Sequence, residues 1–322
     1  MRFNDRAKLD TSQVQDRRGG GGGGGGLGGL GGMLGGGGGL GGGAKAGGGI
    51  GLLLVLGVVV WLMFSGGGSS SSAGGALSQM LGGDAAATAN NSQLDSSCQT
   101  GADANENADC AIVGIVNSVQ NYWTAEFQQS GTTYQKVPTV WFTGSVQTGC
   151  GAANSGVGPF YCPADHQVYI DLSFFTTLKN DFQANDLPFT QAYVLAHEYG
   201  HHVQNLLGTS DRVGAAAGPE SGSVRLELQA DCYAGAWANH ATTVPDSSGE
   251  VLITDVTQED INGALQAAAH IGDDYIQANL GGGGADPSQY THGTSEQRQH
   301  WFTVGYQSGD PAQCNTFDTD AL

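Results

Sequence analysis

The most specific chemical pattern in the chain is a run of five residues that reads H-E-x-x-H, from His197 to His201. Two histidines four residues apart on a helix point to the same side, so both imidazoles can bind one metal ion. Glu198 follows the first histidine and would lie near the fourth coordination position, where it can accept a proton from metal-bound water. The pattern predicts a zinc hydrolase with His197 and His201 as ligands and Glu198 as the general base.

The residues around this motif predict one helix over residues 188–207. Apolar residues lead into the motif and follow it, and no proline interrupts them after Pro188. Such a helix is mostly buried, and a carboxylate inside it is costly without a partner. Glu198 is therefore expected to have a function rather than to be one of several polar residues on a surface helix.

A catalytic zinc ion needs three protein ligands and one open position. Glu227 and Asp231 are four residues apart within a second apolar helix predicted over residues 224–240, so they lie on one face of it. Glu227 is the expected third ligand. Asp231 is expected to accept the distal N–H of a liganding histidine and to fix its tautomer. The alternative is an acidic helix face that binds no metal.

His292 lies in a polar segment, residues 290–298, just before a predicted helix N-cap at Thr294 or Ser295. We consider it as a donor to the developing oxyanion, with a structural loop histidine as the alternative. Arg298 is expected to form a structural ion pair. His202 is about 100° around the helix from His201 and is not expected to bind the metal.

The rest of the pattern predicts an α+β fold that is mainly helical with a small sheet. Strands are expected at residues 138–142 and 168–175, and residues 149–163 are expected to be a loop. The second strand could pair with an extended peptide substrate beside the metal helix. The remaining helices are predicted at residues 109–132, 256–279 and 295–306.

Charge is distributed unevenly along the 322 residues, which carry a formal net charge of −19. Residues 1–49 hold six basic and three acidic side chains, a net of 6 − 3 = +3. The remainder holds five basic and 27 acidic side chains, a net of 5 − 27 = −22. A body this acidic is a poor candidate for binding nucleic acid, which requires basic surface.

One uncharged, mostly apolar run at residues 50–66 predicts a single transmembrane anchor, because its flanks extend it to the length that a spanning helix needs. A glycine-rich stretch before it predicts a disordered tail over residues 1–49, and residues 67–97 are expected to be a flexible linker. The metallopeptidase domain is expected at residues 98–322. Basic residues precede the anchor, which predicts a cytoplasmic N-terminus and an extracytoplasmic domain in the cell membrane.

All six cysteines follow the apolar run, and none forms a C-x-x-C pair. An even number in this part of the chain fits disulfides in an oxidising compartment, with six buried free thiols as the alternative. Close spacing predicts the pairs Cys98–Cys110 and Cys150–Cys162. Elimination leaves Cys232 with Cys314.

Several longer segments extend the motifs described so far over nearly the whole chain. They are MRFNDRAKLDTSQVQDRR, TGCGAANSGVGPFYCPADHQVYIDLSFF, HEYGHHVQ, LELQADCYAGAW and HGTSEQRQHWFTVGY, together with the glycine-rich stretch and the apolar run. In these segments the chain resembles a bacterial family of neutral zinc metallopeptidases. It implies a zincin fold that binds Zn²⁺ through His197, His201 and Glu227. It also implies that Glu198 is the catalytic acid/base and that Asp231 supports a ligand histidine. The expected function is a membrane-anchored zinc peptidase acting on a peptide or protein substrate.

Two other functions remain open at this point. A deformylase-like amidohydrolase would use a cysteine in a Gly-Cys turn as third ligand, and Cys150 between Gly149 and Gly151 offers one. A membrane-tethered binding or scaffolding module would hold a structural metal, although such sites usually have four protein ligands and only three are identifiable here.

Overall fold

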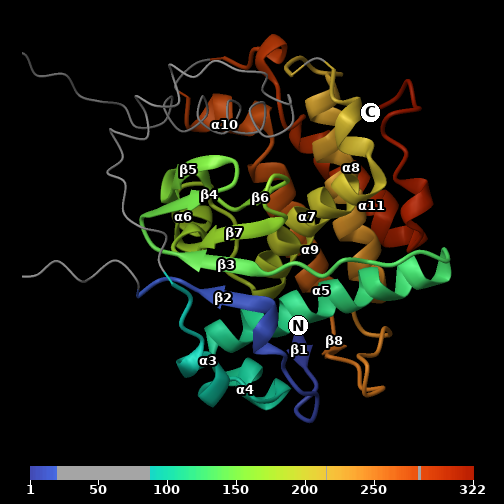
Figure 1. The fold of residues 1–322 in the computed structure, drawn as a ribbon. Helices are drawn as coiled ribbons and strands as arrows, with labels where there is room; N and C mark the ends of the chain where they lie inside the picture. The colour runs from blue at the N-terminus through green and yellow to red at the C-terminus, as the bar shows by residue number, and fades with distance from the viewer. Residues whose placement is uncertain (20–87, 215, 282–283) are drawn as a thin grey trace, which may run out of the picture.

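The helix that carries the H-E-x-x-H motif is α7 (Pro188–Leu207). It packs against α5 (Ala108–Gln129), α8 (Gly222–His240) and α9 (Gln258–His270). Proline occupies its first turn, where the missing N–H costs nothing. Gly208 ends it with φ 73°, a left-handed conformation that glycine adopts without strain. The bounds match the predicted helix. The computed structural model describes residues 1–19, 88–214, 216–281 and 284–322 (Figure 1).

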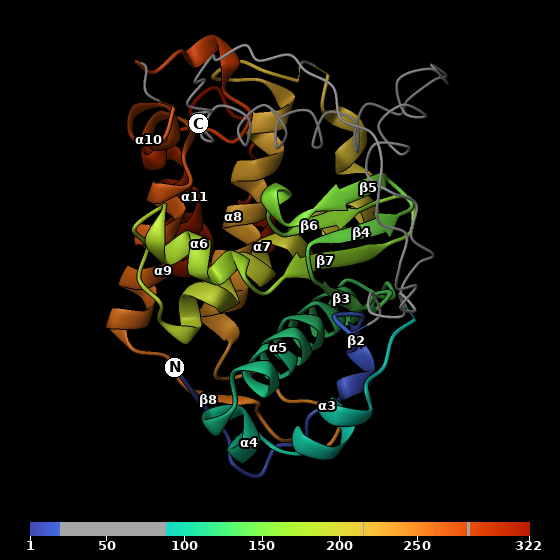
Figure 2. The ribbon, with the colours of Figure 1, turned by 90° about the vertical axis from the view of Figure 1, so that its left-hand side faces the viewer.

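A four-stranded sheet lies on one side of α7, and the helices α8 and α11 (Ser295–Ser308) lie on the other (Figures 1 and 2). Its strand order is β2-β3-β7-β6, formed by β2 (Val14–Asp16), β3 (Thr139–Phe142), β7 (Gln167–Asp171) and β6 (Phe160–Cys162). The first three strands are parallel, and β6 is antiparallel to β7. Because β7 has a partner on each side, the prediction that it pairs with a substrate is wrong.

Two further predictions about this region need correction. The strand expected over residues 168–175 ends at Asp171, and α6 (Phe174–Asn180) begins shortly after it. The expected loop at residues 149–163 contains a hairpin strand and the edge strand β6. The hairpin joins β4 (Ser145–Thr148) to β5 (Gly151–Asn154).

The remaining described helices are α3 (Ser92–Ser97), α4 (Gly101–Glu106), α5 (Ala108–Gln129), α8 (Gly222–His240), α9 (Gln258–His270), α10 (Asp273–Asn279) and α11 (Ser295–Ser308). The helix predicted over residues 256–279 is thus two helices, broken at Gly272. A Cβ there would lie 2.4 Å from the backbone nitrogen of Ser295, so only glycine allows this approach. The mainly helical α+β fold is confirmed.

The N-terminal residues are part of the folded domain, so the prediction of a disordered tail is wrong for residues 1–18. β1 (Arg2–Phe3) pairs with β8 (Ile253–Asp255), and β2 pairs with β3. The side chains of Phe3 and Val14 are buried in the main core. The segment is mostly polar, so its sequence does not indicate that the side chains of Phe3 and Val14 attach it to the core.

The expected linker also belongs to the domain from residue 88 onward. Leu94 of α3 is buried in the core. The Asn90 N–H donates to the Asp16 carbonyl oxygen at 2.8 Å. The Asp16 N–H donates to the side-chain oxygen of Asn91 at 2.9 Å. Residues 90 and 91 therefore lie beside β2, the last described strand before them in the sequence.

No helix in the described part of the chain is long and apolar enough to cross a membrane. The predicted anchor at residues 50–66 lies outside the described residues, as do the rest of the predicted tail and linker. The expected topology, with the N-terminus in the cytoplasm and the domain outside, stays a prediction.

All six cysteines form disulfides, and the three predicted pairs are correct. They are Cys98–Cys110, Cys150–Cys162 and Cys232–Cys314. The first joins α3 to the start of α5, the second links the β4–β5 turn to β6, and the third ties α8 to the C-terminal segment. With no cysteine thiol free, Cys150 is not available as a metal ligand.

Candidate metal centre and active site

Three buried side chains converge on one point between α7 and α8. His197 Nε2 lies 3.2 Å from Glu227 Oε2, and His201 Nε2 lies 3.4 Å from Glu227 Oε1. Ligands held tetrahedrally at zinc–ligand distances of about 2.1 Å are separated by about 3.4 Å. The spacing of these atoms therefore fits a zinc ion bound by His197, His201 and Glu227, the three residues that the sequence predicts.

Close approach of two helices brings Glu227 to the histidines. Gly200, the second variable residue of the motif, faces α8, where a Cβ on it would lie 3.0 Å from the Cα of Ala230. A larger side chain would push the two helix axes apart and withdraw Glu227 from His197 and His201. Glycine at this position thus sets the distance between the two ligand-bearing helices.

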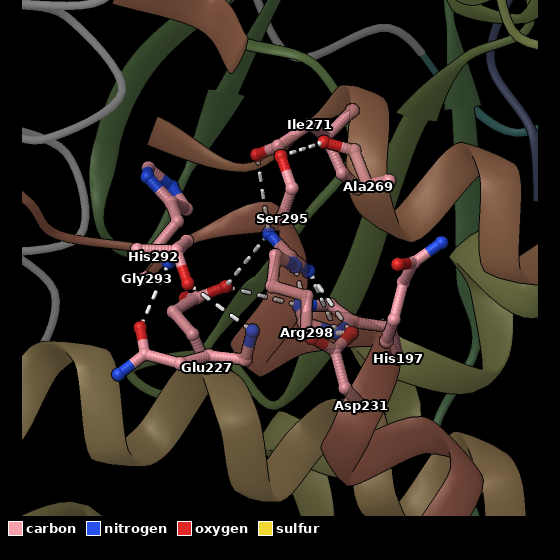
Figure 3. Close-up of polar contacts among 12 residues, drawn as sticks. His197, Glu227, Asp231, Ala269, Ile271, His292, Gly293, Ser295 and Arg298 are labelled. Carbon is pink, nitrogen blue, oxygen red and sulfur yellow. Dashed lines mark hydrogen bonds and ion pairs between the residues drawn. The ribbon is translucent and has the colours of Figure 1, made fainter. Parts of the chain in front are cut away.

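Asp231 supports His197, as predicted. Its Oδ1 lies 2.8 Å from His197 Nδ1, which leaves Nε2 of the same ring for the metal. The same carboxylate accepts hydrogen bonds from the Tyr193 hydroxyl at 2.6 Å and from Arg298 at 2.8 and 3.0 Å. Figure 3 shows the guanidinium of Arg298 between Asp231 and Glu227, and its Nη1 lies 3.9 Å from Glu227 Oε2.

Arg298 reaches this position because α11 packs closely along α8. A Cβ on Gly305 of α11 would lie 1.9 Å from the carbonyl oxygen of Cys232, so only glycine fits at this crossing. The sequence predicts a structural ion pair for Arg298, and the structure confirms one. Its partner, however, is the carboxylate that orients a ligand.

His201 is oriented by a residue that the sequence reasoning missed. Its Nδ1 lies 2.8 Å from the Gln204 side-chain oxygen. The amide nitrogen of Gln204 donates to the Leu226 carbonyl oxygen at 2.7 Å and to the Gln229 side chain at 3.1 Å. A polar residue three positions after a ligand, on a mostly apolar helix, was the available signal. His202 instead faces Tyr161 and the Gln135 carbonyl oxygen, so it is not a ligand.

Electrostatics of the centre favour a bound cation. Burial by itself lowers the pKa of His197, but Asp231 and Glu227 more than offset this and raise it to about 10. Glu227 is also buried, yet the neighbouring His201 and His197 hold its pKa well below the usual range. A divalent cation between these atoms would replace the proton on His197 and would meet an ionised Glu227.

Glu198 lies in the same pocket as the three ligand residues. Burial raises its pKa, and this effect exceeds the opposing one of His197 and His201. A carboxylate with a raised pKa can accept and release a proton nearer to neutral pH than an ordinary glutamate can. Its place and environment suit the general base that the sequence predicts.

His292 also lines this pocket, on a loop held by Asp273 at the start of α10. Asp273 Oδ2 accepts the backbone N–H groups of Thr291, His292 and Gly293 at 2.8, 2.7 and 3.0 Å. The ring Nδ1 of His292 lies 2.9 Å from the Thr291 hydroxyl and 3.3 Å from Asp273. These contacts leave Nε2 for a ligand in the pocket, and Figure 3 shows His292 beside Glu227.

Burial by itself lowers the pKa of His292, but Asp273 and Glu227 outweigh it and raise that pKa. The hydrogen bonds at Nδ1 leave Nε2 free. When Nε2 carries a proton, His292 can donate a hydrogen bond to the substrate. The sequence did not identify Asp273, because it lies 19 residues from His292 and only the fold brings them together.

This arrangement of two histidines on one helix and a glutamate on the next, beside an uncoordinated glutamate, defines the H-E-x-x-H class of metallohydrolase. Cys150 is paired with Cys162, which removes the basis for the deformylase-like alternative. Comparison with known families agrees with the class. The model of the family described as "Putative neutral zinc metallopeptidase" matches residues 1–317, and the chain belongs to this family.

The relatives of this chain do not extend the functional description. An uncharacterized protein of Mycobacterium tuberculosis is 48% identical over 229 residues, which cover 70% of this chain and 76% of the relative. The uncharacterized protein YpfJ of Escherichia coli is 46% identical over 209 residues, or 63% of this chain and 69% of that protein. No solved structure matches the chain.

Proposed function

We propose that this protein is a zinc-dependent peptidase that hydrolyses peptide bonds with Glu198 as the general base. The observation that carries the proposal is the convergence of His197, His201 and Glu227 within 4.8 Å of one another, in a pocket that also contains Glu198. Among the described residues this group has three members, which leaves a fourth position for water. A structural zinc site is usually closed by four protein ligands.

Glu198 and His292 have different roles in the proposed reaction. A bound zinc ion supplies a Lewis acid that lowers the pKa of water and polarises a carbonyl group. Glu198 accepts the proton of the attacking water and passes it to the leaving amine, a double use that its raised pKa favours. Nε2 of His292 donates a hydrogen bond to the oxygen on which negative charge develops.

The edge strand β6 offers a place for the substrate backbone. Within the described sheet it pairs with β7 on one side only, and its residues Phe160 and Tyr161 line the pocket. An extended peptide that adds to this edge would have its backbone fixed by main-chain hydrogen bonds beside the metal centre.

The proposed place of action is outside the cytoplasm, because three disulfides are stable in an oxidising compartment. The apolar run at residues 50–66 would attach the domain to the membrane.

A peptide-library cleavage assay tests this function. Zinc-loaded protein should cleave peptides, a chelator should abolish cleavage, and added zinc should restore it. Glu198→Gln should keep the zinc and lose cleavage, whereas Glu106→Gln, an exposed glutamate on α4, should change neither. Equal cleavage by wild type and Glu198→Gln would overturn the mechanism. Zinc content and an intact fold without cleavage would favour the binding or scaffolding module.

A further inference from the structure

Five of the apolar side chains in the lining of the active-site pocket form what we call its apolar part. They come from α6 and the loop after it, from α7 and from the α9–α10 region, and they are Phe174, Phe182, Val194, Ile271 and Ile276. In the described lining, the titratable groups of His, Arg and acidic residues are those of His197, Glu198, His201, Glu227, His292 and Arg298. The pocket therefore has a catalytic part and an apolar part.

The apolar part begins next to the general base. Val194 is four residues before Glu198 on α7, which is about 6 Å along the helix. Successive residues of an extended peptide are about 3.3 Å apart, with side chains on alternate faces. A side chain directly beside the scissile bond can therefore reach Val194 while its carbonyl group stays at the metal centre.

Contacts with the metal centre and with α9 fix the walls of the apolar part. Arg298 Nη1 lies 3.5 Å from the Ile271 carbonyl oxygen, and His270 Nδ1 lies 2.8 Å from the Phe182 carbonyl oxygen. Ile276 is on α10, whose first residue, Asp273, holds the loop of His292. The apolar walls and the catalytic groups thus share supports, so their spacing is preformed.

We propose that the apolar part binds one large aliphatic or aromatic side chain of the substrate, at the residue next to the scissile bond. This rests on the proposed peptidase function and adds a specificity to it. Burial of such a side chain is favourable because it removes apolar surface from water. A carboxylate or ammonium group would be desolvated there without a partner, which disfavours acidic and basic residues.

Binding of amino-acid hydroxamates to the zinc-loaded Glu198→Gln variant tests the proposal without relying on turnover. The hydroxamate group chelates the metal in every member of the series, so only the side chain differs. Calorimetry should show that the leucine and phenylalanine hydroxamates bind about 10- to 100-fold more tightly than those of glycine and aspartate. Equal affinities across the series would overturn the specificity and leave the metal centre intact. Failure of all four to bind would overturn both proposals.

A second experiment introduces a positive charge into the wall of the apolar part. Phe174 is half-buried, so Phe174→Arg can direct its charge into the pocket without being fully desolvated. The variant should bind the aspartate hydroxamate more tightly than the leucine one, a reversal of the order. Phe175→Arg is the matched control, because Phe175 is also half-buried and does not line the pocket. An unchanged order in Phe174→Arg, or the same reversal in Phe175→Arg, would contradict the proposal.

Discussion

Arg298 binds Asp231 through two hydrogen bonds of 2.8 and 3.0 Å, and both side chains are buried, with 2% and 0% of the residue exposed. Asp231 in turn contacts His197. The helix α11 therefore supports the candidate metal centre, although none of the three proposed ligands lies on it. The guanidinium holds the carboxylate ionised and in place, so that it accepts the N–H of the ligand histidine.

Replacement of Arg298 by methionine is expected to weaken zinc binding about 10- to 100-fold, the usual range for losing a partner that orients a ligand. The variant leaves Asp231 as a buried charge without its cation, which should also destabilise the fold by about 3–5 kcal/mol. Competition with a chelator measures the zinc affinity. Arg212→Met, at an exposed ion pair with Asp318, is the control. An unchanged zinc affinity in a folded Arg298→Met variant would show that the ion pair does not support the centre.

His292→Ala is expected to lower kcat about 10²- to 10³-fold while KM and zinc content change little, because the lost hydrogen bond forms in the transition state. Asp273→Asn should give a smaller decrease, since it loosens the loop without removing the imidazole. Steady-state kinetics on a cleaved peptide measures both effects. His300→Ala, an exposed histidine on α11, is the comparison. A fall in zinc content or a rise in KM alone would assign His292 to binding rather than to the reaction.

Stability of the metal-free protein should increase with pH between about 4 and 6.5 because of His202. Burial lowers the pKa of this histidine from 6.5 to about 4, against a weaker opposing effect of the Gln135 carbonyl. The unfolded chain therefore binds the proton more tightly than the folded one in this range, and the difference amounts to about 3 kcal/mol.

The measurement is urea unfolding at pH 4 and pH 7 in the presence of a chelator. His202→Gln should reduce the difference in unfolding free energy between these pH values by most of that amount. The exposed His300→Gln variant should leave it unchanged. If the unfolding free energy of His202→Gln changed with pH as much as that of the wild type, other groups would be the cause of the acid sensitivity.

Phe3→Ala should destabilise the whole domain by about 3–5 kcal/mol, as expected for a buried aromatic side chain. Phe3 is 2% exposed, and its ring packs against Gly114 of α5, where an added Cβ would lie 2.6 Å from the ring. Urea unfolding followed by circular dichroism gives the change in free energy. Arg2→Ala, on the exposed neighbouring residue, should cost less than about 0.5 kcal/mol. Equal effects of the two variants would argue against a structural role for the N-terminal segment.

The sequence predicted those parts of the site that depend on spacing within one helix. His197, Glu198 and His201 share α7, and Glu227 and Asp231 share α8, so helical periodicity was enough to place them. Gln204 contacts its ligand across one helical turn and could have been found in the same way. The contact between Asp273 and His292 depends on how α10 packs against α11, which local patterns do not encode.

The fold was predicted least well where short segments pair over long distances. β1 and β2 have two and three residues, too few to show a strand period, and their partners are far away in the chain. The residues next to Gly272 do not predict the break there, because it results from the close approach of the Ser295 backbone. In both cases tertiary contacts decided the local structure.

The hydrogen bonds of Asp16 with Asn90 and Asn91 join two stretches of the chain that are 75 residues apart in sequence. Both stretches are held at one strand of the sheet, β2. Loss of the pairing between β2 and β3 would therefore loosen both stretches at once, so this short strand couples the N-terminal residues to the part of the domain that begins at residue 88.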